Sequence, residues 1–148
     1  MDENRIPLDE AYMQMAEIWA LRSYATRTKV GALLVRDRQI ISDGYNGMPK
    51  GVPNHLVELV QPDGSIITNP LVIHAEANVF DKLSEKGSSH GAAGSTLYCT
   101  FSPCIDCAKR IINNKIARFV YRDEYRDTSP LDTLRENGVV ADKLRRLT

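Results

Sequence analysis

The sequence lacks any long hydrophobic run, and no segment approaches the roughly 20 apolar residues of a membrane-spanning helix. Its opening residues, MDENRIP, have neither a basic start nor an apolar stretch, so we expect no signal peptide. The sequence also lacks an excess of charge of either sign, since its 19 acidic and 19 basic side chains cancel. This balance gives no support to a nucleic-acid-binding surface. We therefore expect a protein of the cytoplasm (the host cytoplasm if a phage encodes it) that binds neither membranes nor nucleic acid.

Cysteine is scarce, with Cys99, Cys104 and Cys107 as its three occurrences. An odd number in a chain of 148 residues argues against a disulfide framework and favours metal or redox use in a reducing compartment. Internal repeats and low-complexity tracts are absent too. The length suits one domain with its own hydrophobic core, so we expect a single domain over residues 1–148.

Apolar periodicity predicts a first helix over 8–24, with Asp9 as its cap, followed by a hairpin of strands at 30–35 and 39–45. Residues 46–70 are rich in Gly, Pro and Asn and are predicted to be a long loop, with a brief strand at 66–67.

Beyond this loop, helices and strands alternate. The predicted order is a helix over 75–86, a strand over 96–101, a helix capped by Ser102 with Pro103 at its first position and running to about 114, a strand over 117–121, a helix over 130–137 and a strand beginning at 139. The pattern predicts an α/β protein with three α/β/α layers around a five-stranded mixed sheet.

Two short motifs carry groups that bind metal: His74-Ala75-Glu76 and Pro103-Cys104-Ile105-Asp106-Cys107. The two cysteines lie three apart at a predicted helix start, so both thiols can reach one ion, and the helix end favours thiolate. One imidazole, two thiolates and an open fourth position are typical of catalytic zinc. Glu76 follows His74 by two residues, which makes it a poor second ligand but a suitable acid–base group beside the metal.

Two other interpretations of Cys104 and Cys107 are a redox dithiol and half of a structural zinc site. A structural site needs a fourth ligand, for which Cys99, His55 and His90 are candidates, although none has a paired spacing. Because the motifs fall at predicted strand-to-helix junctions, catalytic zinc is favoured over structural zinc, and the redox pair comes third.

The motifs resemble those of the deoxycytidylate (dCMP) deaminase family within the cytidine deaminase superfamily, in a short form found in phages. The similarity covers nearly the whole chain. The zinc motifs are shared across the superfamily, whereas residues 44–51 (GYNGMPKG), with Asp123 and the Tyr125-Arg126-Asp127 segment, indicate this branch. A third similar segment is Arg22-Ser23 together with residues 26–32.

The resemblance implies a cytidine-deaminase-like fold and a reaction in which zinc hydroxide attacks C4 of cytosine. Ammonia leaves, and dCMP becomes dUMP for thymidylate synthesis. His74, Cys104 and Cys107 would hold one Zn²⁺ per chain, and Glu76 would transfer protons. The implied substrate contacts are Asn46 with the sugar, the Ala75 N–H with the ring O2, the Ser102 carbonyl with the leaving amine, and Arg27, Arg22, Lys29 or Tyr125 with the phosphate.

The family also implies a homo-oligomer, commonly a hexamer, that dCTP activates and dTTP inhibits, with Mg²⁺ accompanying the effector and contacts near residues 44–51. The variable stretch over 52–70 leaves open a choice between dCMP and dCTP. The alternatives are a deaminase of a tRNA base, a free nucleoside or guanine, and a non-catalytic, zinc-stabilised nucleotide-binding module.

Overall fold

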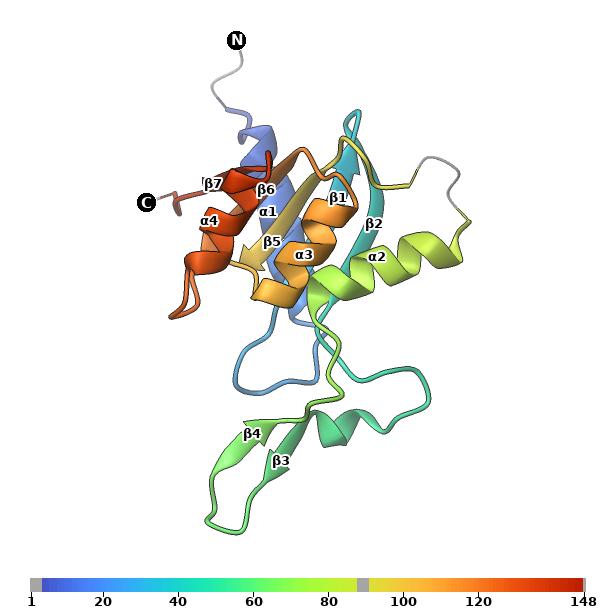
Figure 1. The fold of residues 1–148 in the computed structure, drawn as a ribbon, viewed down its shortest axis with the longest axis vertical. Helices are drawn as coiled ribbons and strands as arrows, with labels where there is room; N and C mark the ends of the chain where they lie inside the picture. The colour runs from blue at the N-terminus through green and yellow to red at the C-terminus, as the bar shows by residue number, and fades with distance from the viewer. Residues whose placement is uncertain (1–3, 88–90, 148) are drawn as a thin grey trace.

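A mixed sheet of five strands in the order β2-β1-β5-β6-β7 forms the centre of the computed structural model, which describes residues 4–87 and 91–147. Strand β1 is antiparallel to both β2 and β5, while β5, β6 and β7 run parallel (Figure 1). The strands are β1 (Gly31–Arg36), β2 (Gln39–Tyr45), β5 (Thr96–Phe101), β6 (Arg118–Asp123) and β7 (Val140–Lys143).

Helices cover both faces of this sheet. Helix α1 (Leu8–Ala20) lies on one face, and α2 (Ala75–Glu85), α3 (Ile105–Asn113) and α4 (Ser129–Glu136) lie on the other (Figure 1). Strand β1 supplies both cores by alternation, because Ala32 and Leu34 pack with α2 and α3 whereas Leu33 and Val35 pack with α1. The predicted three-layer α/β/α fold with a five-stranded mixed sheet is confirmed.

A projecting insert separates β2 from α2. It contains a short 3₁₀ helix (Asn54–Val57) and an antiparallel pair formed by β3 (Glu58–Val60) and β4 (Ile66–Thr68) (Figure 1). The brief strand predicted at 66–67 is present. Its partner β3 and the 3₁₀ helix were not predicted, because elements of three or four residues are too short to show a hydrophobic period.

Two predicted N-caps were wrong, although α1 begins at Leu8 as predicted. Helix α1 begins at Leu8 behind Pro7, without a side-chain cap, and the Asp9 carboxylate instead accepts hydrogen bonds from Tyr98 and Arg118. Helix α3 begins at Ile105, so Cys104 rather than Ser102 occupies its N-cap. In both places a residue of a good capping type has a tertiary partner instead.

The end of α1 was also predicted too late, at 24 instead of Ala20. The hydroxyl of Ser23 donates to Asn46 O at 2.8 Å and accepts from Ala25 N at 3.2 Å, which turns the chain away from the helix axis.

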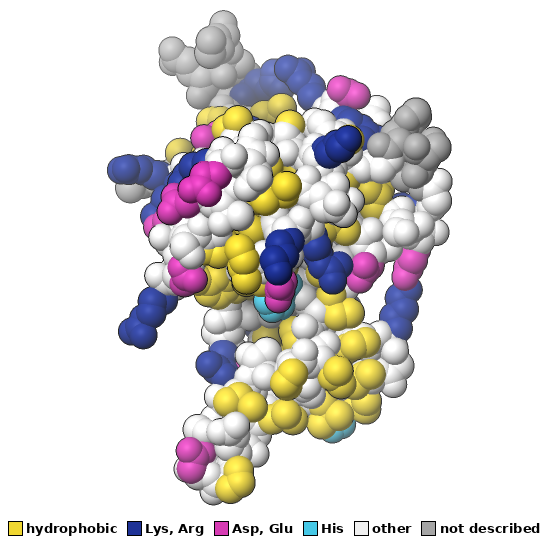
Figure 2. All heavy atoms as spheres, in the orientation of Figure 1, with side chains coloured by type: hydrophobic (Ala, Val, Ile, Leu, Met, Phe, Trp, Pro, Cys, Tyr) yellow, Lys and Arg dark blue, Asp and Glu magenta, His cyan; other side chains and the backbone are white. Residues whose placement is uncertain are grey.

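Acidic and basic side chains are interspersed over the visible body of the molecule, while hydrophobic side chains gather over the insert (Figure 2). Exposed apolar residues there include Val60, Ile66 and Leu71. Across the described ranges, no helix combines the length and the apolar character that a bilayer crossing requires.

Candidate metal centre and active site

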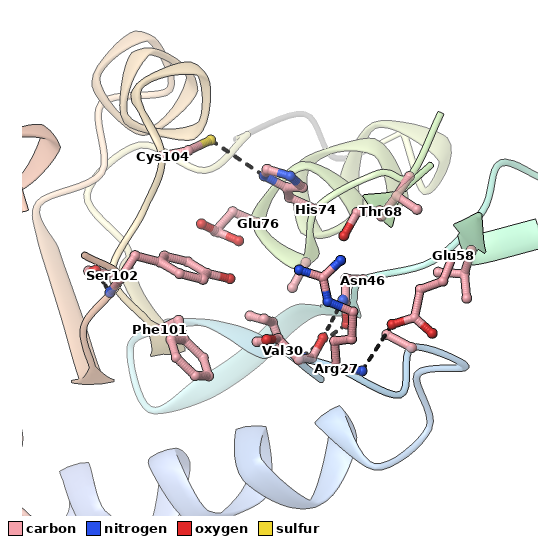
Figure 3. A pocket seen from close by; sticks show the side chains of 16 residues that line it. Arg27, Val30, Asn46, Glu58, Thr68, His74, Glu76, Phe101, Ser102 and Cys104 are labelled. Atoms are coloured by element: carbon pink, nitrogen blue, oxygen red, sulfur yellow. Dashed lines mark hydrogen bonds between the residues drawn. The ribbon is translucent and has the colours of Figure 1, made fainter. Parts of the chain in front are cut away.

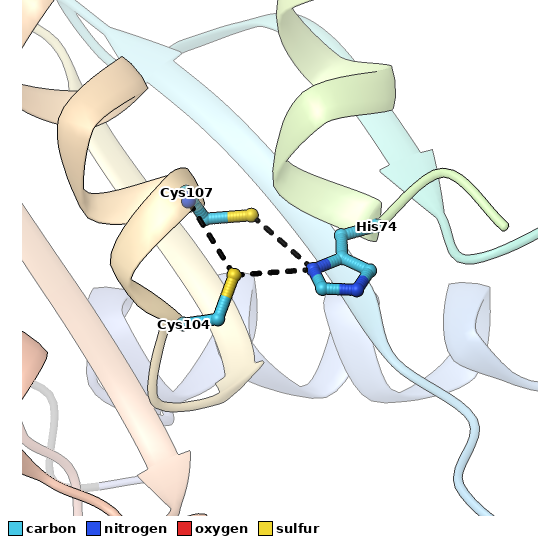
Figure 4. A group of neighbouring side chains, drawn as sticks. All are labelled: His74, Cys104 and Cys107. Atoms are coloured by element: carbon cyan, nitrogen blue, oxygen red, sulfur yellow. Dashed lines mark hydrogen bonds between the residues drawn. The ribbon is translucent and has the colours of Figure 1, made fainter. Parts of the chain in front are cut away.

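His74, Cys104 and Cys107 converge from two helix starts (Figure 4). His74 occupies the N-cap of α2, Cys104 occupies the N-cap of α3, and Cys107 lies in the first turn of α3. His74 Nδ1 is 3.4 Å from Cys104 Sγ and 3.5 Å from Cys107 Sγ, and the three ligand atoms lie within 4.8 Å of one another.

These separations fit tetrahedral zinc. Bonds of about 2.3 Å to sulfur and about 2.0 Å to nitrogen at the tetrahedral angle separate the two ligand atoms by about 3.5 Å. Within the described ranges, no fourth His, Cys, Asp or Glu joins the group. Of the three fourth-ligand candidates, Cys99 and His55 lie outside this group, and His90 lies outside the described residues. The described side chains therefore supply three candidate zinc ligands and no fourth.

The two thiols differ in acidity. A hydrogen bond from the Cys107 thiol lowers the pKa of Cys104 to about 3, helped by the His74 side chain and by the Cys107 N–H, which donates to Cys104 Sγ at 3.4 Å. The same contact with Cys104, together with burial, raises the pKa of Cys107. The contact between the two sulfur atoms therefore favours Cys104 over Cys107 as the thiolate, and binding of a metal ion would displace the protons that remain on the ligand atoms.

Glu76 lies beside this group in the first turn of α2, with only 3% of its surface exposed. Burial is the main cause that raises its pKa above the ordinary value. Its carboxyl does not belong to the ligand group. A buried carboxyl with a raised pKa is suited to taking up and releasing a proton.

A cavity of about 480 Å³ opens next to His74, Cys104 and Glu76 (Figure 3). Most of the predicted substrate-contact residues line this cavity, namely Arg27, Asn46, Ala75, Ser102 and Tyr125. Phe101, Glu58 and Thr68 line it too and were not predicted. Glu58 and Thr68 come from β3 and β4, where no recognisable motif marks them.

Two predicted phosphate contacts are not brought to this cavity. Lys29 Nζ donates to Ser23 O at 2.6 Å, and Arg22 lines a separate hollow beside Gly44 and Met48. Arg27 does line the cavity, where its Nη1 donates to Ile66 O at 2.7 Å. Arg27 and Tyr125 are the two of the four candidates that lie at the site.

Asn46 has a structural contact as well as its place in the cavity. Its Nδ2 donates to Thr28 O and its Oδ1 accepts from Val30 N, both at 2.9 Å. An amide has two donor hydrogens and two acceptor lone pairs, so one of each remains for a ligand.

The opposite wall joins the ends of β5 and β6. Ser102 is fully buried, and its Oγ accepts from Tyr125 N at 3.0 Å. The Tyr125 ring stacks on Phe101, with the centroids 4.9 Å apart. Burial raises the pKa of the Tyr125 hydroxyl, which therefore stays protonated at neutral pH.

Comparisons with known proteins agree with this site. The family described as the cytidine and deoxycytidylate deaminase zinc-binding region matches residues 7–123. Deoxycytidylate deaminase of Mycobacterium phage D29 is 36% identical over 125 residues, covering 78% of this chain and 94% of that protein. The enzyme of the same name from Saccharomyces cerevisiae is 31% identical over 136 residues, covering 88% of this chain. The chain spans less than half of that yeast protein, whose matched part is 43% of its length.

A crystal structure of dCMP deaminase from cyanophage S-TIM5, in complex with dCMP and dUMP, superposes with a TM-score of 0.84 at 41% identity. The match covers 97% of this chain and 99% of that one. A diaminohydroxyphosphoribosylaminopyrimidine deaminase from Thermotoga maritima, at 23% identity and a TM-score of 0.68, shares the fold over 92% of this chain and 36% of its own. The chain therefore belongs to the cytidine and deoxycytidylate deaminase family.

Proposed function

We propose that this protein is a zinc-dependent hydrolase that converts dCMP and water into dUMP and ammonia. The observation that carries the proposal is the group formed by His74, Cys104 and Cys107. This group adjoins a cavity, and the buried Glu76 carboxyl lies beside it. The phage relatives named dCMP deaminases support the choice of substrate.

His74, Cys104 and Cys107 would hold zinc, which supplies the Lewis-acid activation of water that hydrolysis requires. Glu76 takes a proton from the attacking water and delivers it to the cytosine ring nitrogen. It then takes the proton of the new hydroxyl at C4 and passes it to the departing amine, so that ammonia leaves and a carbonyl remains at C4. The raised pKa of Glu76 suits both halves of this transfer.

Groups lining the cavity would hold the substrate. The Ala75 N–H has no partner within α2, because the first helical bond runs from Asn78 N to His74 O, and it is available to the ring O2. The Ser102 carbonyl would accept from the leaving amine, and the remaining amide groups of Asn46 would contact the sugar. Arg27 would meet the phosphate, with Tyr125 nearby.

The charge of the cavity favours a monophosphate over dCTP. Arg27 is the one lysine or arginine among the described residues that line it, and Glu58 adds a negative charge close by. A triphosphate carries roughly two more negative charges than a monophosphate, and the described lining of the cavity offers no further cation to neutralise them.

The protein would supply dUMP for thymidylate synthesis in the cytoplasm, as a homo-oligomer (a hexamer by family resemblance) with one zinc per chain. Activation by dCTP with Mg²⁺ and inhibition by dTTP are part of the proposal. A hollow of about 350 Å³, lined by Gly44, Gly47, Met48 and Lys50, supports an effector site at the 44–51 segment.

The test is ammonia release by the zinc-loaded chain from dCMP, dCTP, deoxycytidine and adenosine-containing tRNA. We expect dCMP to give the highest kcat/KM. Turnover of another substrate with dCMP and dCTP both inert would contradict the substrate assignment, and zinc binding without any turnover would favour a non-catalytic module.

A further inference from the structure

The Glu58 carboxylate joins the projecting insert to the loop that precedes β1. It accepts from the Thr26 hydroxyl at 2.6 Å, from Thr26 N at 3.2 Å and from Arg27 N at 2.9 Å. Two backbone donors and one hydroxyl donor thus converge on a group that only accepts hydrogen bonds. The bond from the Thr26 hydroxyl, helped by the two backbone bonds, holds the pKa of Glu58 below its ordinary value, so this carboxyl is ionised at neutral pH.

A second bond connects the same two segments. The Arg27 guanidinium donates to Ile66 O on β4, and β4 pairs with β3 through Glu58 opposite Thr68. Arg27 is therefore held at its backbone by β3 and at its side chain by β4. Figure 3 shows the guanidinium reaching into the cavity while the Arg27 N–H faces Glu58.

The placement of Glu58 needs a reason, because a carboxylate near a phosphate-binding arginine weakens the attraction for the anion. Its hydrogen bonds with Arg27 go to the main chain, so the guanidinium keeps its remaining N–H donors for a ligand. Fixing the backbone of an arginine lowers the conformational entropy that is lost when its side chain binds a phosphate.

We propose that Glu58 is a positioning residue for phosphate recognition, holding the Thr26–Arg27 backbone against β3 so that the Arg27 guanidinium stays at the cavity. This inference rests on the proposed function, in which Arg27 meets the phosphate of dCMP. Glu58 acts through Arg27 and takes no part in the proton transfers.

The experiment is a double-mutant cycle on the zinc-loaded full chain with dCMP. Glu58→Gln keeps the side-chain shape but replaces one carboxylate oxygen by an NH2 group, so that the donors of either Thr26 or Arg27 lose their acceptor. We expect E58Q to raise KM about tenfold with little change in kcat. In an Arg27→Ala background, E58Q should raise KM less than about twofold further, because the residue through which it acts is gone.

Asp63→Asn is the matched control, since it removes one negative charge from the turn of the same hairpin without touching Thr26 or Arg27. Its KM should stay within about twofold of the wild-type value. A rise in KM equal to that of E58Q would assign the effect to the charge of the hairpin. The inference would also be overturned if KM of the double mutant rose by the product of the two single-mutant factors. A loss of kcat at unchanged KM in E58Q would overturn it as well.

Amide hydrogen exchange separates this inference from the proposed function. E58Q should accelerate exchange at Thr26 and Arg27 even if dCMP is not the substrate, and unchanged exchange there would refute the contact. If E58Q does not fold, Thr26→Val removes the 2.6 Å bond alone and should raise KM for dCMP in the same direction by a smaller factor.

Discussion

The chemical character of Glu76 comes from its position on α2. One residue after the cavity-facing Ala75 and two after His74, it is drawn into the interior where the helix starts, and only 3% of its surface remains exposed. Its carboxyl is not among the grouped metal-ligating atoms, so in the proposed mechanism Glu76 transfers protons and does not bind the ion.

We expect Glu76→Ala to lower turnover of dCMP by at least about 10²- to 10⁴-fold, because the proton acceptor for water is removed. Zinc content should remain near one ion per chain, since His74, Cys104 and Cys107 are unchanged. Metal analysis and steady-state kinetics on the same preparation check both parts.

Asp132→Ala is the matched control, as Asp132 also lies in the first turn of a helix but is exposed on α4. Its kinetics should match those of the wild type. Loss of zinc from E76A would instead identify Glu76 as a ligand.

Most of what the sequence could predict about the site came from residues that lie close together in the chain. His74, Glu76, Cys104 and Cys107 stand in local motifs, and the N-terminal ends of two helices bring them together. Glu58 could not be predicted, because its role depends on a hairpin of three-residue strands meeting a loop 31 positions earlier.

At the scale of elements, the contact between β2 and α2 sets where His74 lies. A Cβ on Gly44 would lie 2.7 Å from Ala75 O and 2.9 Å from Val79 N. Both are backbone atoms of α2, so relief of the clash requires movement of the helix that begins directly after His74. The absence of a side chain on Gly44 therefore allows this close approach.

Gly44→Ala is expected to destabilise the fold by about 1–3 kcal/mol and to weaken zinc retention. Urea unfolding and zinc competition by a chelator measure the two effects. Gly47→Ala is the control, since a Cβ added there would meet no atom within 4 Å, and it should behave like the wild type. Equal stability of G44A and G47A would show that α2 adapts freely.

Elements with strong periodicity were predictable from the sequence, and so were both ends of β2 and β5, whereas the N-caps of α1 and α3 were not. The apolar run of β1 and the strands β5 and β6 follow from continuous burial of their side chains. Asp9 and Ser102 were misassigned as caps because their true partners, Tyr98 and Tyr125, come from distant parts of the chain. Local propensity does not contain that information.

At the scale of the whole molecule, one buried ion pair connects α1 to β6 across 112 positions of sequence. Arg122 donates to both oxygens of Glu10, at 2.6 and 2.9 Å, and both side chains are about 3% exposed. A third contact runs to Glu17 at 2.9 Å. The pair holds the outer helix to the sheet face that lies opposite α2 and α3.

Arg122→Ala should lower the free energy of unfolding by about 3–5 kcal/mol, because it leaves the Glu10 carboxylate buried without a counter-charge. Urea denaturation at neutral pH measures the change. Arg146→Ala removes an arginine that is more than half exposed and also pairs with Glu17, and it should cost at most about 1 kcal/mol. Equal costs for the two variants would contradict a special role for the buried pair.

The same pair should make stability depend on pH. The Arg122 guanidinium holds the pKa of Glu10 below its ordinary value in the folded protein, so the unfolded chain takes up this proton first as the solution is acidified. The stabilisation that Glu10 contributes is therefore complete above the unfolded pKa of about 4.3 and is lost as pH falls through the lower folded value.

Glu10→Gln removes this titration. The free energy of unfolding of E10Q should therefore fall less steeply than that of the wild type between about pH 6 and pH 3, as measured by urea denaturation at each pH. Parallel curves for the two proteins would show that Glu10 titrates alike in the folded and unfolded states, and that the pair does not link the stability of the molecule to pH.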